Sequence, residues 1–449
     1  MYFNYRKQFC ALALAALLLP YFSIAQEVGN TNGKWSLARC IGYAQEHNLQ
    51  IKQMQQDIEI ARNNVTVSKM EYLPSVNASM GHNMSWGRSV NLNDLEIVEN
   101  KLSQSSSMNL SASIPLFEGL RKYNNFKSSL KQLEIANVNI EALEDEISIA
   151  IAKGYLQVLL CMEIEKSAAE SYSSVEAQVK KAQELVNLGS QPYSALLDVK
   201  SQLANENVQL TSARNNTATA MIELSQMLNL PNAETFEIEI PQNTDANIVP
   251  LAISIQEIIG AAADHPEIQK AKLALEQSQL QHKIQKGAAL PVLSLSAGYG
   301  TYYSDSQNAA FLTQFNNNRN PSVGLSLSIP IFNNWRNSAA VRNAKANVEK
   351  SGIGVELAIQ NLEKQIRLAY NEAQGSYEKL KAAAANKEAA TESYSQTEEK
   401  FNLGMANATD YSVAKANMFK AESEYIQCKY QYIFQQKILD YYRNIPLSL

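Results

Sequence analysis

Apolar and polar residues alternate with two different periods along this chain, and each period occurs in both halves. In four short segments the apolar residues recur at every second position, as Leu293, Leu295 and Ala297 do. That period is typical of a β-strand whose two faces meet different surroundings. It predicts two strand pairs, one over residues 75–86 and 107–115 and the other over residues 291–303 and 322–331.

Helical periodicity follows each strand pair. After Pro115 and Pro330 the apolar residues recur at spacings of three and four, which indicates an amphipathic helix with a coiled-coil-like seam. No proline interrupts residues 117–188 or 332–403. Each of these stretches is therefore predicted to be one long helix of roughly 110 Å. Shorter helices are predicted beside them, over residues 37–72 and 192–229 in the first half and over 255–286 and 408–443 in the second.

The chain also repeats itself. Residues 110–117 (LSASIPLF) match residues 325–332 (LSLSIPIF), and an Asn-Leu-Gly triplet occurs at 187–189 and, at the same offset, at 402–404. Self-similarity of this kind indicates a duplicated structural unit. It predicts a first repeat over residues 26–230, an inter-repeat equatorial segment over 231–251 and a second repeat over 252–449.

The N-terminus has the pattern of a Sec signal peptide over residues 1–25. Arg6 and Lys7 precede an apolar run over residues 9–19, and Ser23 and Ala25 place small residues before a cleavage site. The run is too short to span a membrane. The mature chain is therefore expected to be exported.

The strands and helices together limit how the chain can meet a membrane. Both strands of each pair join helices at the same end, so all the helices are expected on one side of the strands. After the leader no run of eighteen apolar residues occurs, so a membrane crossing would have to use strands. Four strands cannot close a barrel, and open edges are not tolerated in lipid.

Barrel closure would therefore need more than one chain. Two chains would supply eight strands and three would supply twelve, and three suit a conduit better because an eight-stranded barrel is filled by side chains. The alternative is a secreted coiled-coil scaffold or adaptor without a pore, whose strand pairs are soluble hairpins.

Composition and motifs exclude several other classes. The net charge is −5 and charged residues make up 18% of the chain, so nucleic-acid binding has no electrostatic support. The cysteines outside the leader are odd in number and widely spaced, which does not describe a disulfide framework or a zinc site. The four histidines are dispersed, and no catalytic grouping or phosphate-binding loop occurs. No enzymatic activity, metal or cofactor is predicted.

The ordered set of motifs resembles the TolC-type outer-membrane efflux proteins, in the form found in Bacteroidetes-like bacteria. The set comprises Trp35-Ser36-Leu37, two Leu-Pro junctions before strands, two Ser-Ile-Pro junctions after strands, and the paired Leu-Gly turns. The resemblance implies a mainly α fold with a transmembrane β-barrel, in which a homotrimer contributes four strands per chain to twelve and continues as a long periplasmic helical barrel. It also implies a passive exit duct in the outer membrane, working with a periplasmic adaptor and an inner-membrane pump of the RND or ABC type in efflux or type I secretion.

The same resemblance implies functional residues at the two turns between long and short helices. Glycine at a helix end is explained by the left-handed backbone it permits, so the turn chemistry alone does not require a binding role. The resemblance places adaptor docking at Leu188, Gly189, Ser190, Leu403, Gly404 and Met405.

A charged aperture gate is the remaining expectation from the resemblance. Asp410 falls at one acidic position of the family and Phe401 at an aromatic one, and Asp198 lies on the equivalent helix of the first repeat. The family's second acidic position falls on Val413 and its arginine on Ala406, so the pattern is incomplete. Asp410 also has a purely structural explanation, because a carboxylate in the first turn of a helix is favoured by the helix dipole.

Overall fold

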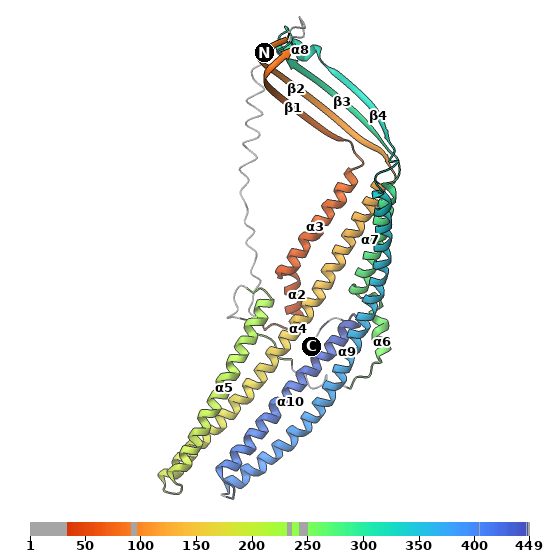
Figure 1. The fold of residues 1–449 in the computed structure, drawn as a ribbon. Coiled ribbons are helices and arrows are strands. Elements are labelled where there is room, and N and C mark those ends of the chain that lie inside the picture. The colour runs from red at the N-terminus through yellow and green to blue at the C-terminus, as the bar shows by residue number, and fades with distance from the viewer. Residues whose placement is uncertain are drawn as a thin grey trace, which may run out of the picture.

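The computed structural model describes residues 34–90, 97–230, 236–241, 250–403, 405–445 and 447. The predicted signal peptide and Gly404 lie outside these ranges. The molecule is elongated, with a β-sheet at one end and long helices that run away from it (Figure 1).

One antiparallel sheet of four strands forms that end. Its strands are β1 (Ser75–Val90), β2 (Ile97–Glu118), β3 (Val292–Ser304) and β4 (Asn320–Ser328), in the order β1-β2-β3-β4. The two halves of the chain meet at the β2–β3 pairing, where Ala112 lies opposite Ala297. The outer strands β1 and β4 each pair on one side only.

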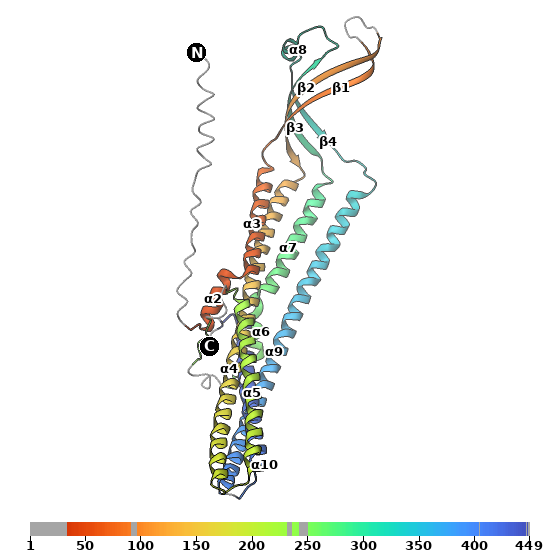
Figure 2. The same ribbon diagram turned by 90° about the vertical axis from the view of Figure 1, so that its left-hand side faces the viewer.

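The helices have matching lengths in the two halves. The long helices α4 (Arg121–Asn187) and α9 (Arg336–Asn402) each have 67 residues, or about 100 Å. The helices α5 (Tyr193–Met227) and α10 (Ala408–Tyr442) each have 35 residues and pack beside the ends of α4 and α9 that lie far from the sheet. Next to the sheet the place of α5 and α10 is taken by α3 (Leu49–Met70) and α7 (Pro266–Gly287), each of 22 residues. Figure 2 shows α3, α4, α7 and α9 descending side by side from the sheet.

Two of the shorter helices are interrupted where the sequence predicted continuous ones. The segment over 37–72 divides into α2 (Leu37–His47) and α3, because Asn48 has an extended backbone and its side chain accepts hydrogen bonds from the Gln50 and Ile51 amides. The segment over 255–286 divides into α6 (Ile255–Ala261), a short 3-10 helix (Ala262–Asp264) and α7. His265 caps α7 in the same way, and Pro266 begins it. The capping side chains of Asn48 and His265 thus end and restart helices that the apolar periodicity predicted to be continuous.

The boundaries between strands and helices also differ from the predicted ones. The strands β1 and β2 extend beyond 86 and begin before 107, and the chain between β3 and β4 contains a short helix, α8 (Phe311–Asn317). The long helices begin at 121 and 336 rather than at 117 and 332. Leu120 and Trp335 have left-handed backbones with φ of 63° and 64°, and this turn delays each helix start.

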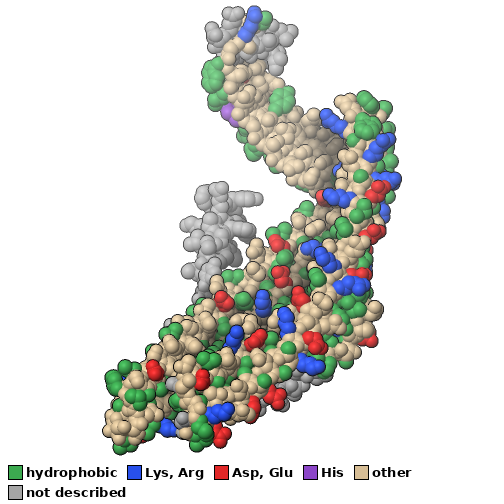
Figure 3. Space-filling model, turned by 60° about the horizontal axis from the view of Figure 1, so that its bottom comes forward, with side chains coloured by type: hydrophobic (Ala, Val, Ile, Leu, Met, Phe, Trp, Pro, Cys, Tyr) green, Lys and Arg blue, Asp and Glu red, His purple; other side chains and the backbone are tan. Residues whose placement is uncertain are grey.

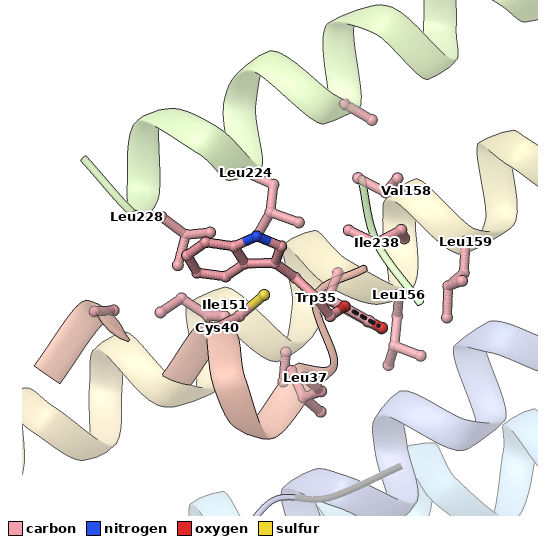
Figure 4. Close-up of a cluster of buried hydrophobic side chains, with 14 of the residues drawn as sticks. Trp35, Leu37, Cys40, Ile151, Leu156, Val158, Leu159, Leu224, Leu228 and Ile238 are labelled. Atoms are coloured by element: carbon pink, nitrogen blue, oxygen red, sulfur yellow. Dashed lines mark hydrogen bonds between the residues drawn. The ribbon is translucent and has the colours of Figure 1, made fainter. Parts of the chain in front are cut away.

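The main apolar core lies halfway along the molecule, and we call it the waist cluster. It surrounds Trp35, with Ile151 and Tyr155 from α4, Leu224 from α5 and Ile238 from the described part of the inter-repeat segment (Figure 4). Buried side chains of α2 and α10 complete it. The waist cluster therefore joins the start of the described chain, both halves and the segment between them.

The helix α4 is unusually apolar for a helix outside a membrane. Among the described residues it is the one helix with an 18-residue window apolar and long enough to cross a membrane, at a mean hydropathy of 1.6. The share of that window buried inside the protein is 44%. Packing of α4 in the waist cluster accounts for this composition without a helical membrane span.

Replacing Tyr155 with Phe tests the waist cluster. The Tyr155 hydroxyl lies 3.0 Å from the Trp35 carbonyl oxygen and 2.6 Å from the Glu239 carbonyl oxygen, and the side chain is buried. Because the variant leaves a buried carbonyl without this donor, we expect the free energy of unfolding to fall by about 1–3 kcal/mol. Denaturant unfolding followed by circular dichroism would measure it.

Tyr370→Phe is the matched control. Tyr370 occupies the same position of the second half, but it is only half-buried and donates a longer hydrogen bond, of 3.3 Å, to the Ile253 carbonyl. We expect a smaller loss for this variant. Equal losses for both variants would contradict the central role given to Tyr155.

Candidate docking tips and aperture

Two helix–helix turns lie at the end of the molecule farthest from the sheet (Figure 1). The first joins α4 to α5 and the second joins α9 to α10. We call them tip 1 (residues 188–192) and tip 2 (residues 403–407). They carry the residues for which the sequence predicted adaptor docking.

Both tips are closed by the same hydrogen bond. In tip 1 the Ser190 amide donates to the Leu185 carbonyl at 2.8 Å and the Gly189 amide donates to the Val186 carbonyl at 3.0 Å. In tip 2 the Met405 amide donates to the Lys400 carbonyl at 2.8 Å, which is the equivalent bond. This is the Schellman arrangement that ends a helix with a left-handed residue. Gly189 has that conformation, with φ of 69°.

Large apolar side chains project from the tips into solvent. Leu188 is 77% exposed in tip 1, and Leu403 and Met405 are 64% and 70% exposed in tip 2. Ser190 and Gly189 are exposed as well. Clustered exposed apolar residues of this kind are typical of a protein-binding surface.

The acidic residues expected at an aperture do not meet within one chain. Asp410 lies in the first turn of α10, where its amide donates to the Asn407 side chain at 2.7 Å, and its carboxylate is exposed. Asp198 is exposed on α5. In the described part of the chain neither carboxylate forms an ion pair or hydrogen bond. Phe401, the third predicted residue, stacks on Tyr411 with ring centroids 4.9 Å apart.

A polar cluster around the buried Tyr411, behind the tips, was not predicted from the sequence. We call it the tip cluster, and it consists of Gln178 on α4, Tyr394 and Glu398 on α9, and Tyr411 on α10. The Tyr394 and Tyr411 hydroxyls are 2.8 Å apart, and Tyr394 donates to the Glu398 carboxylate at 2.8 Å. The Gln178 side-chain amide donates to the Tyr411 hydroxyl, and Tyr411 is only 1% exposed.

The tip cluster therefore links the α9–α10 hairpin to α4 of the other hairpin. Burial raises the pKa of both tyrosines, and hydrogen bonding to Tyr411 and Glu398 raises the pKa of Tyr394 further. Both hydroxyls are consequently protonated at neutral pH and available as hydrogen-bond donors.

A buried lysine adds a second link between the hairpins. Lys415 on α10 is 3% exposed, and its Nζ donates to the Ser171 carbonyl on α4 at 3.2 Å. Burial lowers the pKa of Lys415, while the charges of Glu206 and Glu398 oppose that shift. One turn away, the Ser412 hydroxyl donates to the Gln202 side chain on α5 at 3.1 Å.

The sequence contained only an indirect signal for these residues. Lys415 matches Lys200 across the two repeats, yet Lys200 is exposed and Lys415 is buried. Burial is decided by how the hairpins pack, which a single pattern cannot reveal. No group of three or more His, Cys, Asp or Glu side chains in the described ranges is placed to hold a metal ion.

Gly189→Ala tests the backbone requirement of tip 1. An added Cβ would meet nothing within 4 Å, so any cost comes from the backbone and not from a clash. Because a left-handed conformation costs an L-residue about 1–2 kcal/mol, we expect the free energy of unfolding to fall by about that amount. Denaturant unfolding would measure the change.

Ser190→Ala is the control for this prediction. Ser190 is exposed and contributes its backbone amide to the turn, so the variant is expected to unfold as the natural protein does. A loss as large as that of Gly189→Ala would show that the side chains, and not the left-handed backbone, stabilise the turn.

The chain is similar in sequence to a known protein family and to individual proteins of known name. The model of the family described as "Outer membrane efflux protein" matches residues 40–230 and 259–440. The alkaline protease secretion protein AprF of Pseudomonas aeruginosa is 22% identical over 407 residues, covering 90% of this chain and 83% of AprF. The outer membrane protein TolC of Escherichia coli is 23% identical over 354 residues, covering 75% of this chain and 68% of TolC.

Solved structures share the fold. The crystal structure of CusC, reported in connection with transmembrane channel formation, superposes with a TM-score of 0.76 at 17% identity, over 93% of this chain and 96% of CusC. The Campylobacter jejuni CmeC outer membrane channel gives a TM-score of 0.70 at 17% identity, over 91% of this chain and 85% of CmeC. These matches confirm the predicted resemblance and the predicted fold class of a helical tunnel with channel-forming strands. The chain belongs to the outer membrane efflux protein family.

Proposed function

We propose that three copies of this chain form an exit duct through the outer membrane for a tripartite efflux or type I secretion system. The duct conducts passively from the periplasm to the outside. It works with a periplasmic adaptor that docks at the tips and with an inner-membrane pump of the RND or ABC type. Relatives named for protease secretion and for cation efflux make both kinds of system possible.

The observation that carries this proposal is the absence of charged side chains from most of the length of the strands. Residues 75–87, 102–117, 292–304 and 320–328 contain no Asp, Glu, Lys or Arg. The four strands are 9 to 22 residues long, and a tilted strand needs about 9–11 residues to cross a bilayer. Large apolar side chains alternate along the edge strand β4, where Val323, Leu325 and Leu327 are exposed. This is the composition expected of strands that face lipid.

The unpaired edges of the sheet support the trimer. Strands β1 and β4 each have a free edge, and a free edge cannot lie in lipid. Pairing of β1 in one copy with β4 in the next would remove every edge. Three copies give twelve strands, enough to enclose a passage that eight would fill with side chains.

The two halves of the chain support an internal duplication. Helix lengths of 67, 35 and 22 residues each occur twice, and the family match falls on one stretch in each half. Duplicated units would place six near-equivalent hairpins around a trimeric tunnel. The exposed apolar residues of tips 1 and 2 would then form a ring to which adaptor hairpins bind.

The tip cluster is proposed to hold the tunnel closed. It joins the two hairpins of each chain through the hydrogen bond between Gln178 and Tyr411, and Tyr394 bonds to Tyr411 from within the α9–α10 hairpin. Hydrogen bonds of this kind contribute only about 1 kcal/mol each, so a docking adaptor can break them and let the α9–α10 hairpin move. The apolar waist cluster would remain intact during such a motion.

Single-channel conductance in a planar bilayer tests the exit duct. The natural protein is expected to show long-lived openings of small conductance. The double variant Tyr394→Phe/Tyr411→Phe keeps both rings but removes both hydroxyls, so we expect its mean conductance to rise severalfold. Tyr193→Phe removes an exposed hydroxyl near tip 1 and should leave conductance unchanged.

Two results would count against these claims. Conducting channels with no difference between the double variant and the natural protein would remove the tip cluster from the closure. Silence of every variant at all voltages would instead favour a scaffold without a pore.

Asp410→Ala tests the aperture gate separately. If three Asp410 side chains from the trimer approach one axis, their negative charges attract cations to the mouth of the tunnel. The variant channel is then expected to be less cation-selective, as measured by the reversal potential in a salt gradient. Asp198→Ala, which removes an exposed carboxylate of the other hairpin, is the comparison, and unchanged selectivity in Asp410→Ala would remove Asp410 from the gate.

A further inference from the structure

The helices carry an unusual distribution of charge where they meet the sheet. We consider the two helical turns next to the sheet, residues 63–70 of α3, 121–128 of α4, 280–287 of α7 and 336–343 of α9. These four segments contain eight Lys or Arg residues and no Asp or Glu. Six of the eight are exposed, and we call them the basic collar: Lys69, Lys127, Lys283, Lys286, Arg336 and Arg342.

The next two turns of the same helices are different. Residues 55–62, 129–136, 272–279 and 344–351 contain five basic and five acidic residues. They also contain ion pairs, such as Lys131 with Glu134 and Lys345 with Glu349. Figure 3 shows Lys and Arg side chains gathered where the sheet meets the helices, and both signs of charge farther down. The excess of positive charge is thus confined to the turns beside the sheet, in a chain whose net charge is −5.

The collar residues are not neutralised within the chain. No carboxylate among the described residues lies within ion-pair distance of any of the six. Glu71 follows the end of α3 and Glu118 is the last residue of β2, and neither forms an ion pair with the collar among the described residues. These exposed cations are therefore available to bind anions from outside the chain.

Exposed aromatic rings lie beside two of the collar residues, Lys127 and Arg342. The Lys127 Nζ lies 4.5 Å from the centroid of the Tyr123 ring, and the Arg342 guanidinium lies 5.2 Å from that of Trp335. Both rings are exposed, and each belongs to a residue nearer the sheet than its cation. Tyr and Trp beside Lys and Arg are typical of a membrane–water interface, where rings sit among headgroups and the cations reach their phosphates.

We propose that the basic collar binds the anionic phospholipid headgroups of the leaflet that faces the helices. This proposal rests on the proposed function, because it requires the sheet to span the membrane. The uncharged strands fix the depth of the hydrocarbon, and the collar begins directly outside it. Lys127 and Arg342 are the principal residues, since aromatic rings that prefer headgroups to water hold them at that depth. Binding would fix the axial position of the duct in the membrane while the tips engage other proteins.

Tryptophan fluorescence gives a local test, because Trp335 lies in the collar region. The chain has three tryptophans, of which Trp35 is buried in the waist cluster and Trp86 is exposed on β1. In a Trp86→Phe background, quenching by brominated lipids reports the lipid next to Trp335. We expect brominated phosphatidylglycerol to be preferred over brominated phosphatidylcholine by about fivefold, the effect of one basic residue near a headgroup surface.

Two double variants show whether the lipid preference depends on the collar residues themselves or on the net charge of the helices. Lys127→Gln/Arg342→Gln is expected to reduce the preference to near unity. The matched control Lys272→Gln/Lys350→Gln removes the same charge about two turns farther from the sheet, at exposed residues that form no ion pair within the described ranges, and should keep the preference. Loss of the preference in both variants would overturn the proposal, since net charge would then explain it.

Three further results would overturn the proposal. One is equal quenching of Trp335 by the two brominated lipids in the protein with an unaltered collar. A second is abolition of the preference by millimolar inorganic phosphate, which would make the collar a site for free anions. A third is a changed ion selectivity of the collar variant with an unchanged lipid preference, which would place these residues in the lumen.

Failure of this proposal can be distinguished from failure of the proposed function. If the Trp86→Phe protein conducts ions in a neutral bilayer but shows no lipid preference, the exit duct stands and only the collar proposal fails. If neither brominated lipid quenches Trp335 and no conductance is found, the membrane-spanning sheet itself is contradicted.

Discussion

Among the described residues, the outer strands of the four-stranded sheet each have one unpaired edge, which leaves two rows of backbone N–H and C=O groups without partners inside the chain. In water such edges can be solvated, but in lipid each unsatisfied group costs several kcal/mol. The strands between those edges carry no charged side chain over most of their length, so water is not the environment they suit. Much of the remaining architecture follows from this constraint. In the proposed trimer, copies of the chain complete the sheet, and all the helices leave it on one side.

Two kinds of interaction hold the helices together, and they differ in how easily they can be broken. The waist cluster is apolar, buried and drawn from both halves of the chain. Separating its side chains would expose a large hydrophobic surface, so we expect the helices to stay packed together there. The tip cluster joins the two hairpins by the hydrogen bond between Gln178 and Tyr411, and the buried Lys415 adds a separate hydrogen bond to the Ser171 carbonyl. Such polar contacts can be exchanged for others at small net cost, which suits the end of the molecule where partners are expected.

The charge of the exposed side chains changes along the molecule, from the sheet to the helices. The strands are uncharged over most of their length, the first two helical turns are only basic, and the following turns carry both signs, some of them in ion pairs. In the waist region, burial raises the pKa of Glu144 and of Asp145, and neighbouring carboxylates add to both shifts. A protein that crosses from hydrocarbon through headgroups into water meets three dielectric environments in turn. The distribution of charged residues is the one expected if the sheet spans the membrane as proposed.

The sequence by itself determined the features that depend on near neighbours in the chain. Period-two segments became β1 to β4, proline-free helical periods became α4 and α9, and Asn-Leu-Gly at residue 187 became a Schellman turn at Gly189. These outcomes follow from backbone sterics and side-chain spacing within a few residues, which the chain order contains. Even so, local capping by Asn48 and His265 interrupted helices whose apolar period was continuous, because a side-chain acceptor competes with one more turn of helix.

Only the tertiary structure decided which equivalent residues have equivalent surroundings. Lys200 and Lys415 share a position in the repeat, yet one is exposed on α5 and the other is buried against α4. Tyr155 is buried beneath Trp35, whereas Tyr370 is half-buried. The pairing of Gln178 with Tyr411 joins residues 233 positions apart. Burial and partner choice depend on how helices from the two halves pack against each other, and no pattern within one repeat records that arrangement.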